Sequence, residues 1–232
     1  MINNMDVIKR IKSIQRFLET NNLDGFIQPR SDSYLGEYVP LSDSRLEWIS
    51  GFSGSAGEIL ILRNTAILFV DSRYTIQAVN ETINTDIKVV LSSEESLTDY
   101  IENNLKKLKN IAFDPWLHSL SKIKFLLNVG KKNNLIFTSL KQNPIDLIWV
   151  SNREDAPKTE IKKHIKKYSG ISASIKIKKL CLILKSFNAD SYIISQPDAI
   201  AWLLNIRGAD LKHTPIILTR AIIFKNQKLF LF

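Results

Sequence analysis

Apolar residues near the start of the chain recur at every third or fourth position. Val7, Ile11, Ile14 and Leu18 fall on one face of a helix, whereas lysine and arginine residues occupy the other face. This pattern predicts an amphipathic helix that ends at Asn21-Asn22.

Beyond this helix, short apolar runs alternate with further helical patterns. Such runs, bounded by polar turn residues, are typical of strands. The alternation indicates the α/β class, with helices on the faces of one sheet. The predicted strands are 24–29, 58–62, 65–70, 86–91, 111–113 and 135–138, and the predicted helices are 42–49, 73–81, 96–109 and 121–130.

Two of these strands are expected to form a hairpin, because only Arg63-Asn64 separates residues 58–62 from 65–70. An antiparallel pair inside the alternating pattern predicts a mixed sheet rather than a purely parallel one.

Polar residues mark the expected helix ends. Ser42 or Asp43 is expected to cap the helix over 42–49, and Gly51 to end it in a left-handed conformation. Ser92-Ser93, followed by Glu94-Glu95, resemble a capping arrangement for the helix over 96–109.

The character of the chain changes after residue 150. Lys, Glu and Asp dominate 151–169, with Pro157 among them, which indicates a linker between a first domain, 1–150, and a second unit, 170–232. In the second unit we expect helix 173–187, strand 190–195, helix 198–205 capped by Asp198, and strands 216–224 and 228–232. This α-β-α-β-β order repeats the opening of the first domain, so we interpret the chain as carrying a duplicated fold.

The second unit looks incomplete by itself. Roughly sixty residues are marginal for an independent core, and an apolar final strand, 229–232, is normally paired or covered. We expect either another chain or further polypeptide to cover it.

Several features of the sequence indicate the cellular compartment in which the protein is expected. The longest apolar runs, 66–70 and 145–150, are too short to span a membrane, and the first residues lack the pattern of a secretory signal. The single cysteine, Cys181, has no partner for an internal disulfide, which fits the reducing cytoplasm. Its apolar neighbours favour a core position over a nucleophile.

The net charge of +9 raises the question of nucleic-acid binding. The sequence offers no basic ribbon interleaved with aromatic residues and no recognition motif. Much of the excess lies between residues 153 and 185, where we interpret it as linker and solvated helix face, so we predict no nucleic-acid partner.

Three glycines, Gly51, Gly54 and Gly57, are spaced like part of a phosphate-binding loop. Such a loop follows a strand and opens a helix, whereas here the helix comes first and the strand follows. We therefore expect the glycines to allow close backbone packing.

The histidines and carboxylates of the sequence do not show the spacing that is typical of metal ligands. His118, His164 and His213 have no histidine or carboxylate three or four residues further on, and a two-metal site needs several carboxylates and a histidine. A catalytic Ser-His-Asp triad remains an alternative, although the sequence contains no G-x-S-x-G motif of the kind that carries a nucleophilic serine. We therefore predict no metal site and name no catalytic residue.

Asp71-Ser-Arg73-Tyr74 lies where a strand meets a helix. Asp71 can cap that helix, and Arg73 can pair with Asp71 or Asp43. A structural ion pair is the simpler interpretation, but Arg73 and Tyr74 are also candidates for contact with a substrate or a neighbouring domain.

Two separate segments carry a family resemblance. Tyr34 to Tyr74, with Arg45-Leu-Glu-Trp-Ile-Ser-Gly-Phe-Ser-Gly-Ser-Ala-Gly57 at its centre, closely resembles the amino-terminal domain of the three-domain Xaa-Pro aminopeptidases (aminopeptidase P, of the creatinase/prolidase superfamily). Ser195 to Gly208, continuing to His213-Thr-Pro215, resembles the second domain of that family. Ser72 stands where the family commonly has glycine.

The resemblance implies a creatinase N-terminal-like, ribonuclease H-like domain, in which helices flank a mixed sheet, followed by part of a second similar domain. In the complete enzyme, two divalent metals, typically manganese, activate water in a carboxy-terminal pita-bread domain that removes the residue preceding proline. The metal ligands of that domain have no matching motif here. The first two domains would shape the cleft, limit peptide size and support oligomerisation.

Arg207 and His213 are polar and close in sequence, so they can line a cleft toward a following catalytic domain. We expect no peptidase activity from this chain alone. The alternatives are a binding module that pairs with a separately encoded catalytic half, and a remnant without function.

Overall fold

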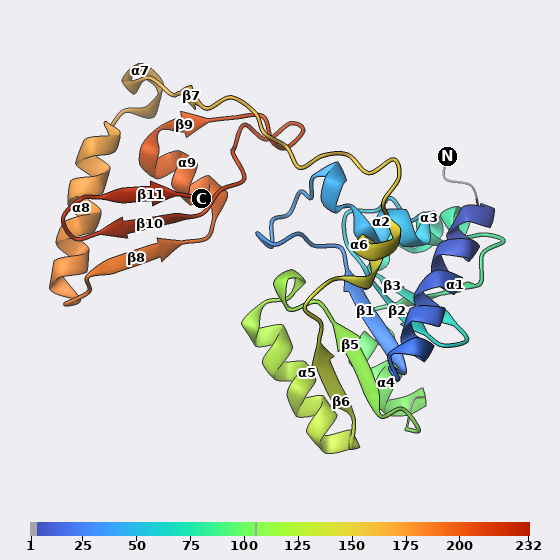
Figure 1. Ribbon diagram of the computed structural model, residues 1–232. Helices are drawn as coiled ribbons and strands as arrows, with labels where there is room; N and C mark the ends of the chain where they lie inside the picture. Colours follow the sequence, from blue (N-terminus) through green and yellow to red (C-terminus); the bar gives the residue numbers. More distant parts are fainter. Residues whose placement is uncertain (1–3, 105) are drawn as a thin grey trace. The chain divides into compact units, whose positions relative to one another are not determined.

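The computed structural model describes residues 4–104 and 106–232. It divides into two compact units, Met1–Glu154 and Asp155–Phe232 (Figure 1). Each unit has its own sheet and its own core.

A six-stranded mixed sheet forms the centre of the first unit, with strand order β4-β3-β2-β1-β5-β6. β1, β2 and β3 pair antiparallel, whereas β4 is parallel to β3, and β5 and β6 extend the other side in parallel. The predicted hairpin and mixed sheet are confirmed. The strands are β1 (Gly25–Pro29), β2 (Glu58–Leu62), β3 (Ala66–Val70), β4 (Ile87–Leu91), β5 (Asn110–Phe113) and β6 (Ile136–Ser139).

Helices cover both faces of this sheet. On one face, α1, α2 and α6 pack over Phe26 and Ile61, and on the other, α4 and α5 pack over Ile27 and Leu60. All four of these strand side chains are fully buried, as expected for a sheet covered on both sides. The helices are α1 (Asn4–Thr20), α2 (Arg45–Ser50), α3 (Thr75–Glu81), α4 (Leu97–Asn104), α5 (Leu120–Asn133) and α6 (Pro144–Ile148).

The first helix follows the predicted pattern. Val7, Ile11, Ile14 and Leu18 are each at most 4% exposed and lie on the face of α1 that packs into the core. Helical periodicity of apolar residues is thus sufficient here to identify the buried face.

Two predicted helix caps were wrong. Leu41–Asp43 forms a separate 3-10 turn, and Ser44 precedes α2 without a side-chain cap. Asp43 is instead engaged by the guanidinium of Arg45. For α4, the reciprocal capping bonds join Ser96 and Asp99, so the capping pair begins four residues after Ser92.

The second unit repeats the strand arrangement that opens the first. β8 (Ser191–Ile194), β10 (Ala221–Phe224) and β11 (Leu229–Leu231) pair antiparallel in the order β11-β10-β8, which corresponds to β3-β2-β1. α8 (Ala173–Ser186) and α9 (Pro197–Leu204) pack on one face of this sheet. The predicted α-β-α-β-β order is therefore present in both units.

The segment expected as a linker contains two short elements. β7 (Lys162–Lys163) pairs with β9 (Ile206–Arg207), and α7 (Lys166–Ser169) follows it. Thr159 also bonds to Asp210 through its backbone N–H and its hydroxyl. Most of this segment thus lies against the second unit.

Two further boundaries differ from the sequence prediction. Asp198 does not cap α9, which begins after Gln196 with Pro197 in its first turn, a position that suits the fixed φ of proline. The strand expected from residue 216 begins only at Ala221, because Leu218 donates its N–H to the Asp210 carboxylate instead of joining the sheet.

Replacing Ile61 by Ala should destabilise the first unit by about 2–5 kcal/mol, because the removed methyl groups leave a cavity. Ile61 is fully buried, whereas Ile76 on α3 is 78% exposed, so the same change at Ile76 should alter stability by less than about 0.5 kcal/mol. Urea denaturation followed by circular dichroism measures both. Equal effects of the two substitutions would contradict the assigned core.

Candidate functional site

An ion cluster around the buried Arg45 holds the start of α2 to α6. Arg45, 9% exposed, donates to both carboxylate oxygens of Asp146 at 2.8 and 3.1 Å and pairs with Asp43 at 2.7 Å. Arg153 bonds to Asp146 and, through Nε, to the carbonyl oxygen of Ser42. Two guanidiniums and two carboxylates thus form one network of ion pairs.

Two tryptophans stack beside this cluster. The rings of Trp48 and Trp149 lie 5.2 Å apart at 18°. Arg10 lies over the Trp48 ring at 4.3 Å, and Arg153 lies over the Trp149 ring at 4.9 Å. Cation–π contact on both rings adds to the stacking, so the pair has a fixed geometry.

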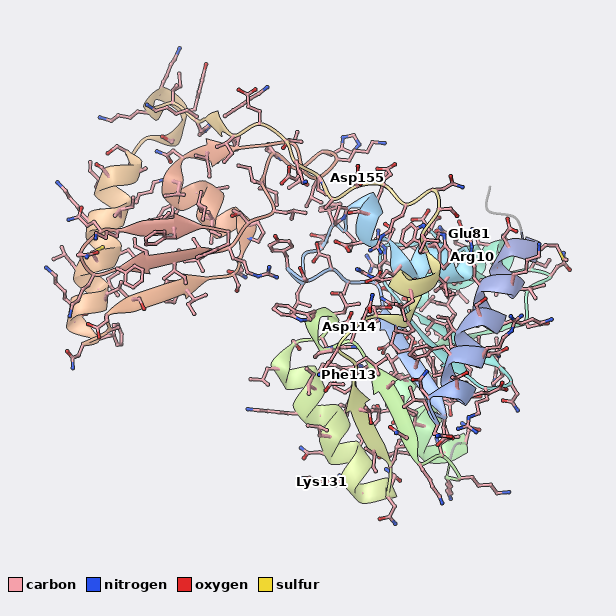
Figure 2. All side chains as sticks on the ribbon, viewed as in Figure 1. Arg10, Glu81, Phe113, Asp114, Lys131 and Asp155 are labelled. Carbon is pink, nitrogen blue, oxygen red and sulfur yellow. The ribbon has the colours of Figure 1, made fainter. Side chains whose placement is uncertain are left out.

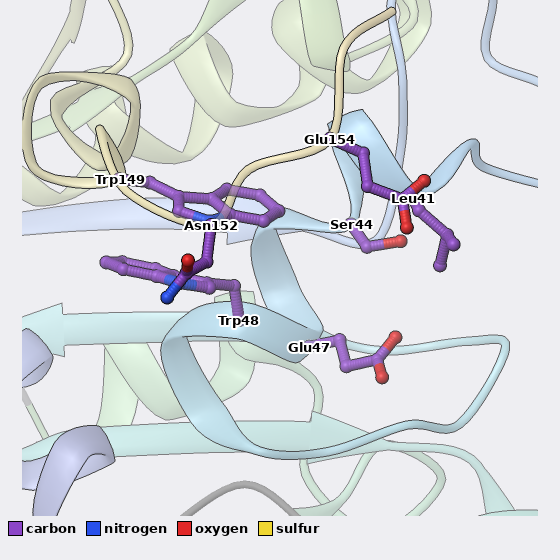
Figure 3. A pocket seen from close by; sticks show the side chains of 7 residues that line it. All are labelled: Leu41, Ser44, Glu47, Trp48, Trp149, Asn152 and Glu154. Atoms are coloured by element: carbon purple, nitrogen blue, oxygen red, sulfur yellow. The ribbon is translucent and has the colours of Figure 1, made fainter. Parts of the chain in front are cut away.

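A surface pocket of about 180 Å³ opens along this pair. Figure 3 shows Glu47 and Glu154 on the same side of the two indoles, with Ser44 between them and Asn152 in front. Burial raises the pKa of Glu47. The positive charge of Arg30 opposes this rise, whereas the negative charge of Glu81 adds to it.

The glycine run after α2 serves backbone packing. Gly51 ends α2 with φ of 78°, a conformation that side chains disfavour. A methyl group at Gly54 would lie 2.1 Å from the Phe52 ring. The expected packing role of the glycines therefore agrees with their surroundings.

Arg73 and Tyr74, both predicted as contact residues, lie together in the 3-10 turn after β3. The exposed Arg73 guanidinium pairs with Asp71 at 2.6 Å and lies over the Tyr74 ring at 5.1 Å. Its hydrogen bonds lower the pKa of Asp71, and Asp71 also accepts the Arg73 backbone N–H as an N-cap. The pairing of Arg73 with Asp43, considered from the sequence, does not occur, because Asp43 pairs with Arg45 and Arg153.

Tyr74 also joins a hydroxyl pair with Ser55, and this contact lowers the pKa of Tyr74. The tyrosine ring packs edge-on against Phe52. The end of the family-like segment at Tyr74 is thus tied to the centre of that segment at Phe52 and Ser55.

Arg207 and His213, the two predicted contact residues of the second unit, differ in their surroundings. Arg207 is half-buried and donates to the carbonyl oxygens of Ala201 and Ile206, which fastens the end of α9. His213 is exposed in the turn bridged by Leu211 and Thr214, with φ of 65°. Asn205, in the left-handed conformation, ends α9 as predicted.

A buried polar network closes the carboxyl ends of β1 and β5. The Asn143 amide donates to Gln28 at 2.9 Å and to Asp114 at 3.1 Å. Figure 2 shows Phe113 and Asp114 at the end of β5, and the Phe113 ring makes an edge contact with His118. Sequence reasoning missed this network because it joins residues up to 115 positions apart.

Within residues 4–104 and 106–232, no group of three or more histidine, cysteine, aspartate and glutamate side chains is arranged to hold a metal ion. No helix in the part of the chain that the structure describes is long and apolar enough to cross a membrane.

Sequence comparison assigns both units to one family. The profile of the creatinase/prolidase N-terminal domain matches residues 10–148, and a second profile of the same description matches residues 152–232. The chain therefore belongs to the creatinase/prolidase N-terminal domain family, which confirms the resemblance seen in its motifs.

Its relatives include curated proteins described as probable Xaa-Pro aminopeptidase P. The protein from Penicillium rubens is 31% identical over 94% of this chain, and that from Aspergillus flavus is 32% identical over 93%. The chain spans only 36% and 33% of their lengths.

Among solved structures, X-prolyl aminopeptidase from Caenorhabditis elegans, described as a cytosolic enzyme with a di-nuclear active site, is similar over the whole chain. The TM-score is 0.87 at 24% identity, and the match covers 39% of that protein. This similarity confirms the fold class expected from the sequence.

The pH dependence of stability should report on His118. Burial, and secondly Lys122, lower the pKa of His118 to about 4 from the ordinary 6.5. Between these values the unfolded chain binds a proton that the folded chain does not, so stability falls as pH falls, by about 3 kcal/mol for this group.

The His118→Gln variant should lose that contribution, while His213→Gln, in an exposed turn, should keep it. Urea midpoints of the first unit at pH 7.5 and 4.5 provide the comparison. Parallel pH profiles for the wild type and His118→Gln would refute the assignment.

Proposed function

We propose that this chain is the non-catalytic N-terminal region of a metal-dependent Xaa-Pro aminopeptidase, which acts on proline-containing peptides. The observation that carries the proposal is the alignment of 94% of the chain with about a third of each probable Xaa-Pro aminopeptidase P. The C. elegans enzyme is described as having a di-nuclear active site, and by family resemblance we propose that the complete enzyme uses two divalent metals, manganese among them. We further propose that these metals bind outside the residues of this chain.

The surroundings of the three histidines support the same proposal. His118 is buried beside Phe113, His164 lies beside Tyr168, and His213 is exposed in a turn. A bridged pair of metals needs ligands that converge, and these three histidines lie in different parts of the fold.

In the complete enzyme, the two units would shape access to the active site and support oligomerisation. Arg73 and Tyr74 present charge and an aromatic ring on the first unit, and Arg207 and His213 do so on the second. We propose these residues as contacts to substrate or to a neighbouring domain. We further propose a cytoplasmic location, by similarity to the cytosolic C. elegans enzyme.

The purified chain, supplied with Mn²⁺, should not cleave an Arg-Pro-Pro tripeptide, because a water-activating metal pair is not expected in it. Release of free arginine, measured by chromatography against a heat-killed sample, is the assay. Metal-stimulated release that survives repurification would contradict the proposal.

A second candidate is a binding module that pairs with a separate catalytic chain. Ile193, Ile222 and Phe230 lie side by side across the second sheet, and Ile193 and Phe230 are 67% and 53% exposed. In the first unit, the corresponding row, Ile27–Leu60–Ile67, is fully buried beneath α4 and α5.

The β8 edge of the second sheet also corresponds to the edge of β1 that β5 occupies. An apolar row beside an open edge is suited to receive a strand and a helix from another polypeptide. This observation favours pairing through β8 and the Ile193 row.

A polypeptide covering the remaining two-thirds of the Penicillium relative should therefore co-elute with this chain in size-exclusion chromatography. Ile193→Asp should abolish the complex, whereas Ile76→Asp on the exposed side of α3 should not. Separate elution of the unmodified chains, or a complex indifferent to Ile193→Asp, would remove the binding-module candidate.

A further inference from the structure

The pocket beside Trp48 and Trp149 contains two carboxylates without partners. Neither Glu47 nor Glu154 makes a side-chain hydrogen bond or ion pair among the described residues. Glu47 is half-buried, whereas Glu154 is exposed at the pocket rim. A half-buried carboxylate such as Glu47 normally has a donor or a cation close by, because burial penalises its charged form. The pocket therefore presents negative charge that the fold itself does not neutralise.

The arginines nearest the pocket are already engaged. Arg45 and Arg153 share Asp43 and Asp146, and Arg10 donates to the Trp48 carbonyl oxygen at 2.6 Å. Arg30 affects the charge of Glu47 and donates through Nε to the Gly54 carbonyl oxygen, whereas its buried Nη1 has no hydrogen-bond partner among the described residues. Glu47 and Glu154 are thus left available for an external cation.

The aromatic wall is preorganised for a ligand. The facing sides of the two indoles are in contact, so the guanidiniums of Arg10 and Arg153 cover the outer sides. The ring edges then line the pocket as a rigid apolar surface, which costs little entropy when a ligand binds.

The pocket wall also contains an unused donor. Trp149 is only 7% exposed, and its Nε1 is buried without a hydrogen-bond partner. In Figure 3, this nitrogen lies on the side of the pocket where Asn152 is drawn. Buried indole N–H groups are normally paired, so the site suits a ligand that carries a hydrogen-bond acceptor as well as a cation.

We propose that this pocket binds an organic cation of amino-acid size, namely a protonated amine on a short peptide-like stem. Glu47 and Glu154 would receive the ammonium, the indole edges would contact the stem, and Trp149 Nε1 would donate to a carbonyl oxygen after a small shift of Asn152. A volume of about 180 Å³ is below the range of pockets for larger ligands, which limits the occupant to a single residue.

Two carboxylates and apolar walls do not suit a hard metal ion. Calcium takes six to eight oxygen ligands, whereas this pocket offers oxygen atoms chiefly from Glu47, Glu154, Ser44 and Asn152. The same chemistry can come from a peptide N-terminus or from a lysine side chain, and the experiment separates these sources.

The test is titration of the full chain with leucinamide, which carries only an α-ammonium, and with N-acetyl-lysine methylamide, which carries only a side-chain ammonium. N-acetyl-leucinamide is the uncharged control. Binding is followed through the four indole N–H signals in NMR, which Trp48→Phe and Trp149→Phe variants assign. Trp116 and Trp202 serve as internal references, because neither lines the pocket.

We expect saturable shifts of the Trp48 and Trp149 signals with at least one amine and none with the uncharged control. Glu47→Gln and Glu154→Gln should each weaken binding at least tenfold, while Glu94→Gln, the same charge change at an exposed position of the same unit, should not. Saturation by leucinamide identifies an α-amine as ligand, and saturation by the lysine derivative alone identifies a side chain. No saturable shift with either amine, or unchanged binding in both pocket variants, would overturn the proposal.

Discussion

The burial of Arg45 is the constraint on which the first unit depends most. A guanidinium that is nearly inaccessible to water must be surrounded by acceptors, because an unpaired buried charge is very costly. Asp43 and Asp146 meet that need from widely separated positions in the sequence, and Arg153 completes the cluster. The start of α2 is thereby tied to α6 and to the segment that follows it. Trp48 and Trp149 stack as a result, and the pocket with Glu47 and Glu154 lies along their edges.

The two units place the same strand pattern in different surroundings. In the first, β5 pairs with the edge of β1, and helices bury both faces of the sheet. In the second, α8 and α9 bury one face, while Ile193 and Phe230 on the other are largely exposed. The hydrophobic effect rewards burial of such a row roughly in proportion to its area, which gives any covering polypeptide a source of binding energy.

Local signals predicted most of the secondary structure. The spacing of Val7, Ile11, Ile14 and Leu18 identified the buried face of α1, and the short gap at Arg63-Asn64 identified the β2–β3 hairpin. Errors arose where a polar side chain had a distant partner. Asp43 was expected as a cap but pairs with Arg45 and Arg153, and Asp210 holds Leu218 outside the predicted strand.

The sequence by itself determined the α/β class, the repeated element order and the family, because periodicity and contiguous motifs are local properties of the chain. The tertiary structure alone decided which charges are paired and which remain available. Trp48 meets Trp149, and Arg45 meets Asp146 across 101 positions. Pairings at such separations depend on how the strands assemble into a sheet, and local sequence patterns do not encode that arrangement.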